Sequence, residues 1–215
     1  MRTKAGDNAR AVPPTAFVAL VPALLVPALL VAYPTSVWPA MVIYHAYCLL
    51  ASFLYEDWPD PRPLHVRLAP PSWPPVVAAL AILAAGEAVA RGVVDVHPWL
   101  PPQAPALLAA AVPWPYFVAY AIAANGYVEE RFWRGPMLHH TGILGGAAAF
   151  GTMHGAAGAV LFDVTSGALC GTGAFVAGIV WGGLRARYDA LWPCVLTHVA
   201  LNAAALRIAS ALLAP

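Results

Sequence analysis

Long apolar stretches dominate the pattern of hydrophobic and polar positions along this 215-residue chain. A helix needs about 20 consecutive apolar residues to cross the hydrocarbon core of a bilayer, and windows of about that length recur along the sequence. Prolines cluster between several windows, as at 59–63 and 98–102, where they end helices because proline has no backbone N–H. The pattern therefore predicts about seven membrane spans, near residues 14–33, 37–55, 74–94, 105–125, 141–162, 167–184 and 190–213.

The composition supports a membrane protein and excludes a nucleic-acid-binding one. Hydrophobic residues make up 61% of the chain and charged residues 10%, against about 45–50% and about 25% in an ordinary soluble domain. The net charge is +1, and no basic run is present that could follow a phosphate backbone. We therefore expect an all-α, polytopic transmembrane helical bundle, with residues 1–215 forming a single integral membrane domain in contact with the lipid bilayer.

The distribution of basic residues predicts the orientation of the chain. If the N-terminus is cytoplasmic, most of the arginines and lysines fall on or near the cytoplasmic side, and Arg91 and Arg207 lie nearer the other face. The cytoplasmic set is Arg2, Lys4, Arg10, Arg62, Arg67, Arg131, Arg134, Arg185 and Arg187. This asymmetry follows the positive-inside rule. We expect a protein of the cell (plasma) membrane with its N-terminus in the cytoplasm.

Small and isolated polar residues within the windows predict helix contacts. Glycines recur at a spacing of four in the windows 141–162 and 167–184, which favours close packing of these two helices through their backbones. The pairs are Gly142/Gly146, Gly151/Gly155, Gly167/Gly171 and Gly178/Gly182. Glu87 and Arg91 have the i,i+4 spacing of an ion pair within one helix. His45, alone in its window, is predicted to be hydrogen-bonded between helices.

Ionisable residues inside membrane spans cost roughly 2.5–3.5 kcal/mol each at mid-depth, so they indicate functional sites by default. One such group is the run from Glu129 to Arg134, which continues the fourth window and ends before Pro136. Glu130 and Arg134 are i,i+4 neighbours and can neutralise each other within one helix. Glu129 lies about 100° around the axis and lacks this local partner. The alternative is that these charges form a solvated helix end among the lipid headgroups.

Two further polar groups lie within apolar windows. His154 occurs in the middle of a glycine-rich window, and His198 precedes Asn202 by four residues, which places imidazole and carboxamide on one helix face. A carboxylate, imidazoles and an amide from three helices are the groups that hydrolysis of a peptide by activated water needs. Glu129 can act as the general base with His154 orienting the water. His198 and Asn202 can donate hydrogen bonds to the oxyanion.

A zinc-dependent reaction uses the same residues. Two histidines and one carboxylate are a common catalytic zinc set, so Glu129, His154 and His198 would be the ligands. The helical HExxH signature that fixes two zinc ligands together with a base is missing. The favoured mechanism therefore requires no cofactor, and zinc stays open as the alternative.

The three polar groups resemble the signatures of the CAAX protease and bacteriocin-processing (CPBP) family, which includes the type II CAAX prenyl proteases. They read EExxxR from Glu129, FxxxH from Phe150 to His154, and HxxxN from His198 to Asn202, and the resemblance covers roughly residues 125–205. It implies an all-helical intramembrane endopeptidase whose catalytic residues converge from three helices.

Residue by residue, the resemblance implies catalytic positions at Glu129, His154, His198 and Asn202 and a structural ion pair between Glu130 and Arg134. Members of the family are often labelled metalloproteases. Eukaryotic and archaeal members cleave prenylated CAAX proteins, and many bacterial members act on other substrates. The expected partner is a membrane-bound or lipidated protein or peptide.

Two other classes of function are compatible with the same pattern. A non-proteolytic membrane protein on this fold would act as a scaffold or an immunity protein. A transporter or proton relay would also place glutamates and histidines within the membrane. The complete polar set argues against the scaffold, and the lack of an evident internal repeat argues against the transporter.

Overall fold

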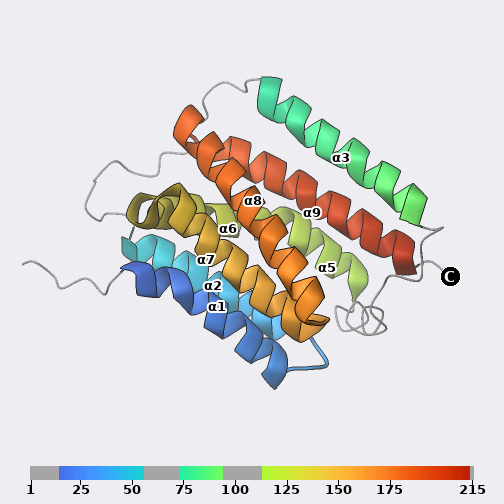
Figure 1. Ribbon diagram of the computed structural model, residues 1–215, viewed down its shortest axis with the longest axis horizontal. Helices are drawn as coiled ribbons and strands as arrows, with labels where there is room; N and C mark the ends of the chain where they lie inside the picture. The colour runs from blue at the N-terminus through green and yellow to red at the C-terminus, as the bar shows by residue number, and fades with distance from the viewer. Residues whose placement is uncertain (1–14, 56–72, 94–112, 214–215) are drawn as a thin grey trace, which may run out of the picture.

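Residues 15–55, 73–93 and 113–213 are described by a computed structural model, and every element within them is helical (Figure 1). The long helices are α1 (Thr15–Ala32), α2 (Trp38–Tyr55), α3 (Trp73–Val93), α7 (Leu138–Leu161), α8 (Val164–Tyr188) and α9 (Trp192–Leu213). The short helices α5 (Trp114–Tyr120) and α6 (Gly126–Phe132) are joined by the π-helical turn η2 (Ala121–Asn125), and η3 (Trp133–Met137) joins α6 to α7. The predicted all-α class is confirmed for these residues.

Five stretches of helix are long and apolar enough to cross a membrane. They are Trp38–Tyr55, Trp73–Gly92, Trp114–Leu161, Val164–Tyr188 and Trp192–Ala211, and α1 contributes the shorter apolar stretch Phe17–Ala32. Large apolar side chains such as Leu24, Leu54 and Val164 are exposed on the outside of the bundle, as expected for helices that face lipid. The chain is therefore an integral membrane protein, whereas the predicted count of about seven spans is not confirmed.

Some of the sequence predictions lie outside the described residues. These are the proline-rich loops at 59–63 and 98–102, the first part of the span at 105–125, and the basic residues Arg2, Lys4, Arg10, Arg62 and Arg67. The orientation of the N-terminus stays a prediction for this reason.

The helices that carry the three motifs lie at the centre of the bundle (Figure 1). Helix α7 packs against α8 on one side and α1 on the other, and α2 packs against both α1 and α6. Helix α9 contacts α6 and α8 and carries α3 on its outer side. Residues from α2, α6, α7, α8 and α9 can therefore reach one another in the interior.

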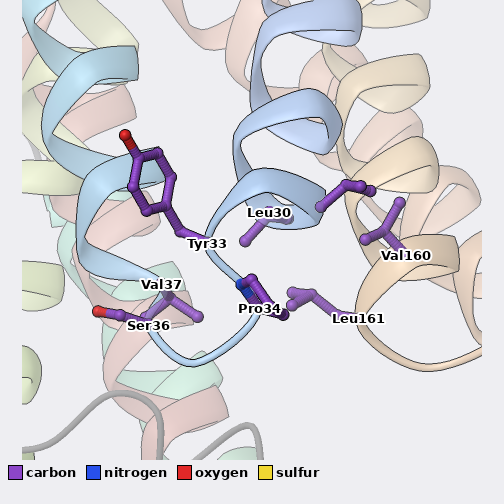
Figure 2. A pocket seen from close by; sticks show the side chains of 8 residues that line it. Leu30, Tyr33, Pro34, Ser36, Val37, Val160 and Leu161 are labelled. Carbon is purple, nitrogen blue, oxygen red and sulfur yellow. The ribbon is translucent and has the colours of Figure 1, made fainter.

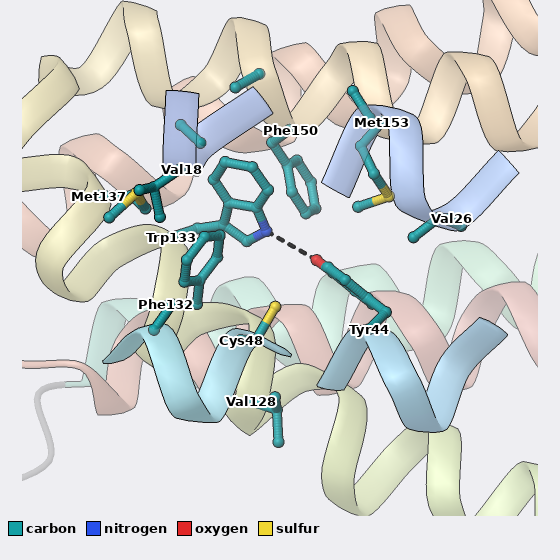
Figure 3. Close-up of a cluster of buried hydrophobic side chains, with 14 of the residues drawn as sticks. Val18, Val26, Tyr44, Cys48, Val128, Phe132, Trp133, Met137, Phe150 and Met153 are labelled. Carbon is teal, nitrogen blue, oxygen red and sulfur yellow. Dashed lines mark hydrogen bonds between the residues drawn. The ribbon is translucent and has the colours of Figure 1, made fainter. Parts of the chain in front are cut away.

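A cluster of large buried side chains fills the space between α2, α6 and α7 (Figure 3). Phe132, Trp133 and Phe150 meet there edge to face, with ring centroids 4.8 Å apart for Phe132–Trp133 and 5.6 Å apart for Trp133–Phe150. The indole Nε1 of Trp133 donates a hydrogen bond of 3.0 Å to the hydroxyl of Tyr44 on α2. This bond satisfies a polar atom that would otherwise be buried unpaired in the apolar cluster.

The α7–α8 interface confirms the predicted close packing through glycines. A Cβ atom placed on Gly167 would lie 2.7 Å from the carbonyl oxygen of Gly155, and one on Gly151 would lie 2.8 Å from the carbonyl oxygen of Gly171. Neither Gly146, whose added Cβ would meet only Thr141 of its own helix, nor Gly142 belongs to this seam, so that part of the prediction was wrong. The φ of Gly142 is +68°, and nothing lies within 4 Å of its added Cβ. Gly142 therefore serves the backbone kink near the start of α7.

Helix α3 is held to α9 by small residues and by an ion-pair network. The predicted Glu87–Arg91 pair is confirmed, with Arg91 Nε 2.9 Å from Glu87 Oε1. The same carboxylate also accepts from Arg207 of α9, whose Nε lies 2.8 Å from Oε2. Close by, a Cβ on Gly86 would overlap with Cβ of Ala204, so the two backbones approach very closely.

The seam between α7 and α8 can be tested with a pair of matched alanine substitutions on α8. Gly167→Ala places a methyl group against backbone atoms that cannot move away, and we expect it to lower the free energy of unfolding by about 1–3 kcal/mol. Gly173→Ala is the control, because nothing lies within 4 Å of its added Cβ. There alanine should stabilise the helix by up to about 1 kcal/mol. Thermal unfolding in detergent measures both, and equal shifts of the same sign would contradict the seam.

Candidate active site

The two glutamates of the first motif lie inside the bundle. Relative exposure is 2% for Glu129 and 0% for Glu130, both on α6, and 3% for Arg134 in η3. A solvated helix end would leave these side chains in contact with water, so the headgroup alternative does not describe them. Their charges instead have to be compensated by protein groups.

Glu130 is compensated by two donors from different elements. Arg134 Nη1 donates to Glu130 Oε1 over 3.1 Å, and His198 Nδ1 of α9 lies 2.7 Å from the same oxygen. The guanidinium group also lies over the rings of Phe150 and Trp181, at 4.8 and 4.9 Å from their centroids. The first and third motifs are thus joined at one carboxylate oxygen, beneath two aromatic rings.

His198 is fixed between both glutamates. A carboxylate only accepts hydrogen bonds, so the contact with Glu130 places the proton on Nδ1 and turns Nε2 toward Glu129. Nε2 lies 3.4 Å from Glu129 Oε2. The indole of Trp181 stacks flat on this imidazole, with centroids 4.1 Å apart and an interplanar angle of 12°. Ring orientation and tautomer are therefore both determined by neighbours.

His154 of α7 enters the site from another side. Its Nδ1 donates to the carbonyl oxygen of Phe150 over 3.0 Å, which leaves Nε2 of the neutral ring as an acceptor. Glu129 is near enough for its charge to act on this ring. The ring of Phe150 packs against His154 at 4.3 Å and faces His198 at 6.3 Å. The first residue of the FxxxH motif therefore borders both imidazoles.

Asn202 is hydrogen-bonded to the backbone of a neighbouring element. Its Nδ2 donates to the carbonyl oxygen of Ala121 over 3.0 Å and so ties α9 to the π-helical turn η2. One of the two N–H groups of the amide is used in this contact, and the second is available to another acceptor. The predicted role of Asn202 at the oxyanion stays a prediction.

A hydrogen-bonded chain that the sequence patterns did not single out also ends on Glu129. Asn125 Nδ2 lies 3.4 Å from Glu129 Oε2, and Asn125 Oδ1 lies 2.8 Å from Nε2 of His45 on α2. The other ring nitrogen of His45 lies 2.6 Å from the hydroxyl of Tyr120. The prediction that His45 is hydrogen-bonded between helices is confirmed. Asn125 was missed, although its i,i+4 spacing to Glu129 was a signal that could have found it.

The donor set for zinc is not assembled in this arrangement. Glu129, His154 and His198 are all described residues, and they do not form a group of three side chains that could hold one ion. Among the described residues no other group of three histidine, cysteine, aspartate or glutamate side chains does so either. His198 instead directs its two ring nitrogens at the two carboxylates.

A cavity of about 290 Å³ lies at the other end of α7, away from these polar groups (Figure 2). It is lined by Leu30, Val31, Tyr33, Pro34, Ser36, Val37, Val160 and Leu161. Its walls come from the end of α1, the α1–α2 connection and the end of α7, and no titratable group of the polar cluster faces it. The cavity is therefore separate from the candidate active site.

The buried pair can be tested by removing its acceptor. Glu130→Ala would leave Arg134 and the Nδ1–H of His198 without their carboxylate, and we expect a loss of about 3–5 kcal/mol in the free energy of unfolding. Asp189→Asn is the control, because it removes the charge of the exposed Arg185–Asp189 pair at a left-handed position that asparagine tolerates. The yield and melting temperature of purified protein should fall for the first variant alone. A Glu130→Ala protein as stable as wild type would contradict the interpretation.

Comparison with known proteins agrees with the motifs. Residues 110–204 match a family model described as type II CAAX prenyl endopeptidase Rce1-like. This region contains Glu129, Glu130, Arg134, His154, His198 and Asn202. No curated protein and no solved structure matches the chain. The resemblance predicted from the three motifs is thus confirmed for residues 110–204, which are similar to Rce1-like type II CAAX prenyl endopeptidases.

Proposed function

We propose that this chain is an intramembrane endopeptidase that hydrolyses peptide bonds of membrane-associated substrates with a water molecule activated by glutamate and histidine. The observation that carries the proposal is the position of His198 between Glu129 and Glu130 inside an apolar bundle. Two adjacent buried carboxylates are costly in such surroundings, and titratable groups arranged in this way are typical of functional sites.

Glu129 is the general base in this mechanism. Its Oε2 faces Nε2 of His198 and the amide of Asn125, so the carboxylate is held at the centre of the polar cluster. A water molecule between Glu129 and His154 gives one proton to the carboxylate, and its oxygen attacks the carbonyl carbon of the scissile peptide. Nε2 of His154 accepts the second hydrogen bond of that water and so orients it.

His198 and Asn202 stabilise the tetrahedral intermediate. The Nδ1–H of His198 is committed to Glu130, so Nε2 is the ring nitrogen left to serve the oxyanion, and it does so as an N–H donor when the ring carries a second proton. Asn202 adds the N–H that is not bonded to Ala121. Loss of one such donor typically lowers the rate about 10²–10³-fold. When the peptide bond breaks, the proton held by Glu129 passes to the leaving amine.

The substrate class follows from the family and from the membrane location. Type II CAAX prenyl endopeptidases act on lipidated protein termini, and the apolar outer surface of this bundle is compatible with a prenylated CAAX-type substrate that arrives from the bilayer or the cytoplasmic face. The proposal includes a cytoplasmic N-terminus in the plasma membrane and about seven crossings. Support for this count comes from α1 and from Gly135, where the backbone leaves helical geometry inside the 48-residue stretch Trp114–Leu161.

Glu129→Gln tests the base directly. The amide keeps the size of the side chain and cannot accept the proton of water, so cleavage of a fluorogenic C-terminal lipopeptide by purified protein should fall to background. His154→Ala should also lose cleavage. Glu87→Gln, the same substitution in a membrane helix away from the site, is the matched control and should retain cleavage. A Glu129→Gln protein that cleaves at the rate of wild type would refute this mechanism.

Chelation tests the zinc alternative on the same samples. Because Glu129, His154 and His198 do not form a group that could hold one ion, we expect the rate of lipopeptide cleavage to be unchanged after incubation with a strong chelator. Metal content is measured in parallel by elemental analysis. Loss of activity with recovery on addition of zinc would establish a metalloprotease and overturn the cofactor-free mechanism.

A further inference from the structure

Helix α2 supplies a polar connection to the general base Glu129. This helix lies outside the region that the family model matches. His45 is 3% exposed and stands 65 residues before the matched segment begins at residue 110. It bonds Tyr120 through Nδ1 at 2.6 Å and Asn125 through Nε2 at 2.8 Å, and Asn125 contacts Glu129 at 3.4 Å. We call Tyr120, His45 and Asn125 the α2 arm.

The directions of the hydrogen bonds in the α2 arm follow from its last member. An ionised carboxylate accepts only, so Asn125 presents its Nδ2–H to Glu129 and its Oδ1 to His45. His45 must then donate from Nε2, which leaves Nδ1 of the neutral ring as an acceptor for the hydroxyl of Tyr120. Every contact has one donor and one acceptor, so the arrangement is self-consistent with a neutral imidazole.

The α2 arm does not conduct protons. An amide gives up its N–H proton and takes one on its oxygen only by way of an unstable tautomer, and Asn125 stands between His45 and Glu129. What the arm can deliver to Glu129 is orientation. The N–H donated by Asn125 meets Oε2, so this oxygen is held and the direction of the carboxylate plane is restricted.

We propose that His45 is a positioning residue for the base, acting through Asn125 to hold the carboxylate of Glu129 in the direction needed to receive a proton from water. The inference rests on the proposed function. Without the Nε2–H of His45, the amide of Asn125 is free to rotate and Glu129 loses a fixed donor. Misplacement of a reacting group by about 1 Å costs up to about 100-fold in rate. The α2 arm acts on the general base Glu129, so kcat should fall while KM changes little.

The experiment measures kcat and KM for a fluorogenic C-terminal lipopeptide, together with the melting temperature, for full-length protein in detergent. His45→Leu removes the arm, and His45→Gln can restore a donor near the position of Nε2. Tyr47→Phe is the matched control, because its hydroxyl donates a 2.7 Å bond from the same helix to the carbonyl oxygen of Val18 on α1. It removes one interhelical hydrogen bond of α2 and leaves the arm intact.

We expect His45→Leu to lower kcat about 10- to 100-fold with KM within about twofold. His45→Gln should recover most of the loss, and Tyr47→Phe should keep the kcat of wild type. Asn125→Leu should lower kcat similarly, with no further loss in the double variant with His45→Leu.

Two results would overturn the positioning role. One is a His45→Leu protein with the kcat of wild type, and the other is a His45→Gln protein that stays folded and is as slow as His45→Leu. Failure of the protease proposal itself gives a different result. In that case the wild-type protein shows no lipopeptide cleavage that is lost in Glu129→Gln.

Discussion

A guanidinium group inside an apolar bundle has to be matched by a carboxylate, and the pairing of Arg134 with Glu130 determines where most of the other polar groups of this protein lie. Removing either charge from water is costly, and only close pairing with further hydrogen bonds offsets that cost. Glu130 therefore also accepts from His198, and Trp181 covers both the imidazole and the guanidinium. One ion pair thus fixes the relative rotation of α6, α8 and α9.

Small residues on neighbouring helices make this pairing sterically feasible. Gly178 of α8 lies against Ala147 of α7, and its added Cβ would lie 3.5 Å from Nη2 of Arg134. The glycine seam brings α8 close enough to α7 for the ring of Trp181 to reach Phe150, at a centroid distance of 6.0 Å. The packing of two apolar helices and the environment of the buried charges therefore depend on the same residues.

Several features of the site followed from sequence because they are local to one helix. The i,i+4 spacing of Glu130 and Arg134 predicted their contact, and the motif order predicted that α6, α7 and α9 meet. The partners of individual hydrogen bonds between helices did not follow. Spacing placed Asn202 on the same face of α9 as His198, but it did not predict the contact of its amide with Ala121. His45 and Asn125 are 80 residues apart, and no pattern along the chain joins them.

The number of membrane spans shows the same limit of prediction from the sequence. Hydropathy rises and falls with composition, whereas the kinks at Gly135 and Gly142 depend on backbone torsions. The stretch Trp114–Leu161 remains apolar across both kinks and so counts as one candidate span. Where a helix ends within such a stretch is decided by the backbone torsions of individual glycines, which hydropathy does not report.

The π-helical turn η2 makes the site sensitive to chain length at one place. An i→i+5 turn holds one residue more than an α-helical turn, and it is bordered here by the carbonyl of Ala121, which accepts from Asn202, and by Asn125, which contacts Glu129. Deleting one residue from Ala121–Asn125 would let the segment relax into a continuous α-helix. The deletion would also change the angle between Ala121 and Asn125 around the helix axis, so the contacts with Asn202 and with Glu129 could not both be kept. Descendants of this sequence can therefore exchange side chains in this turn more freely than they can change its length.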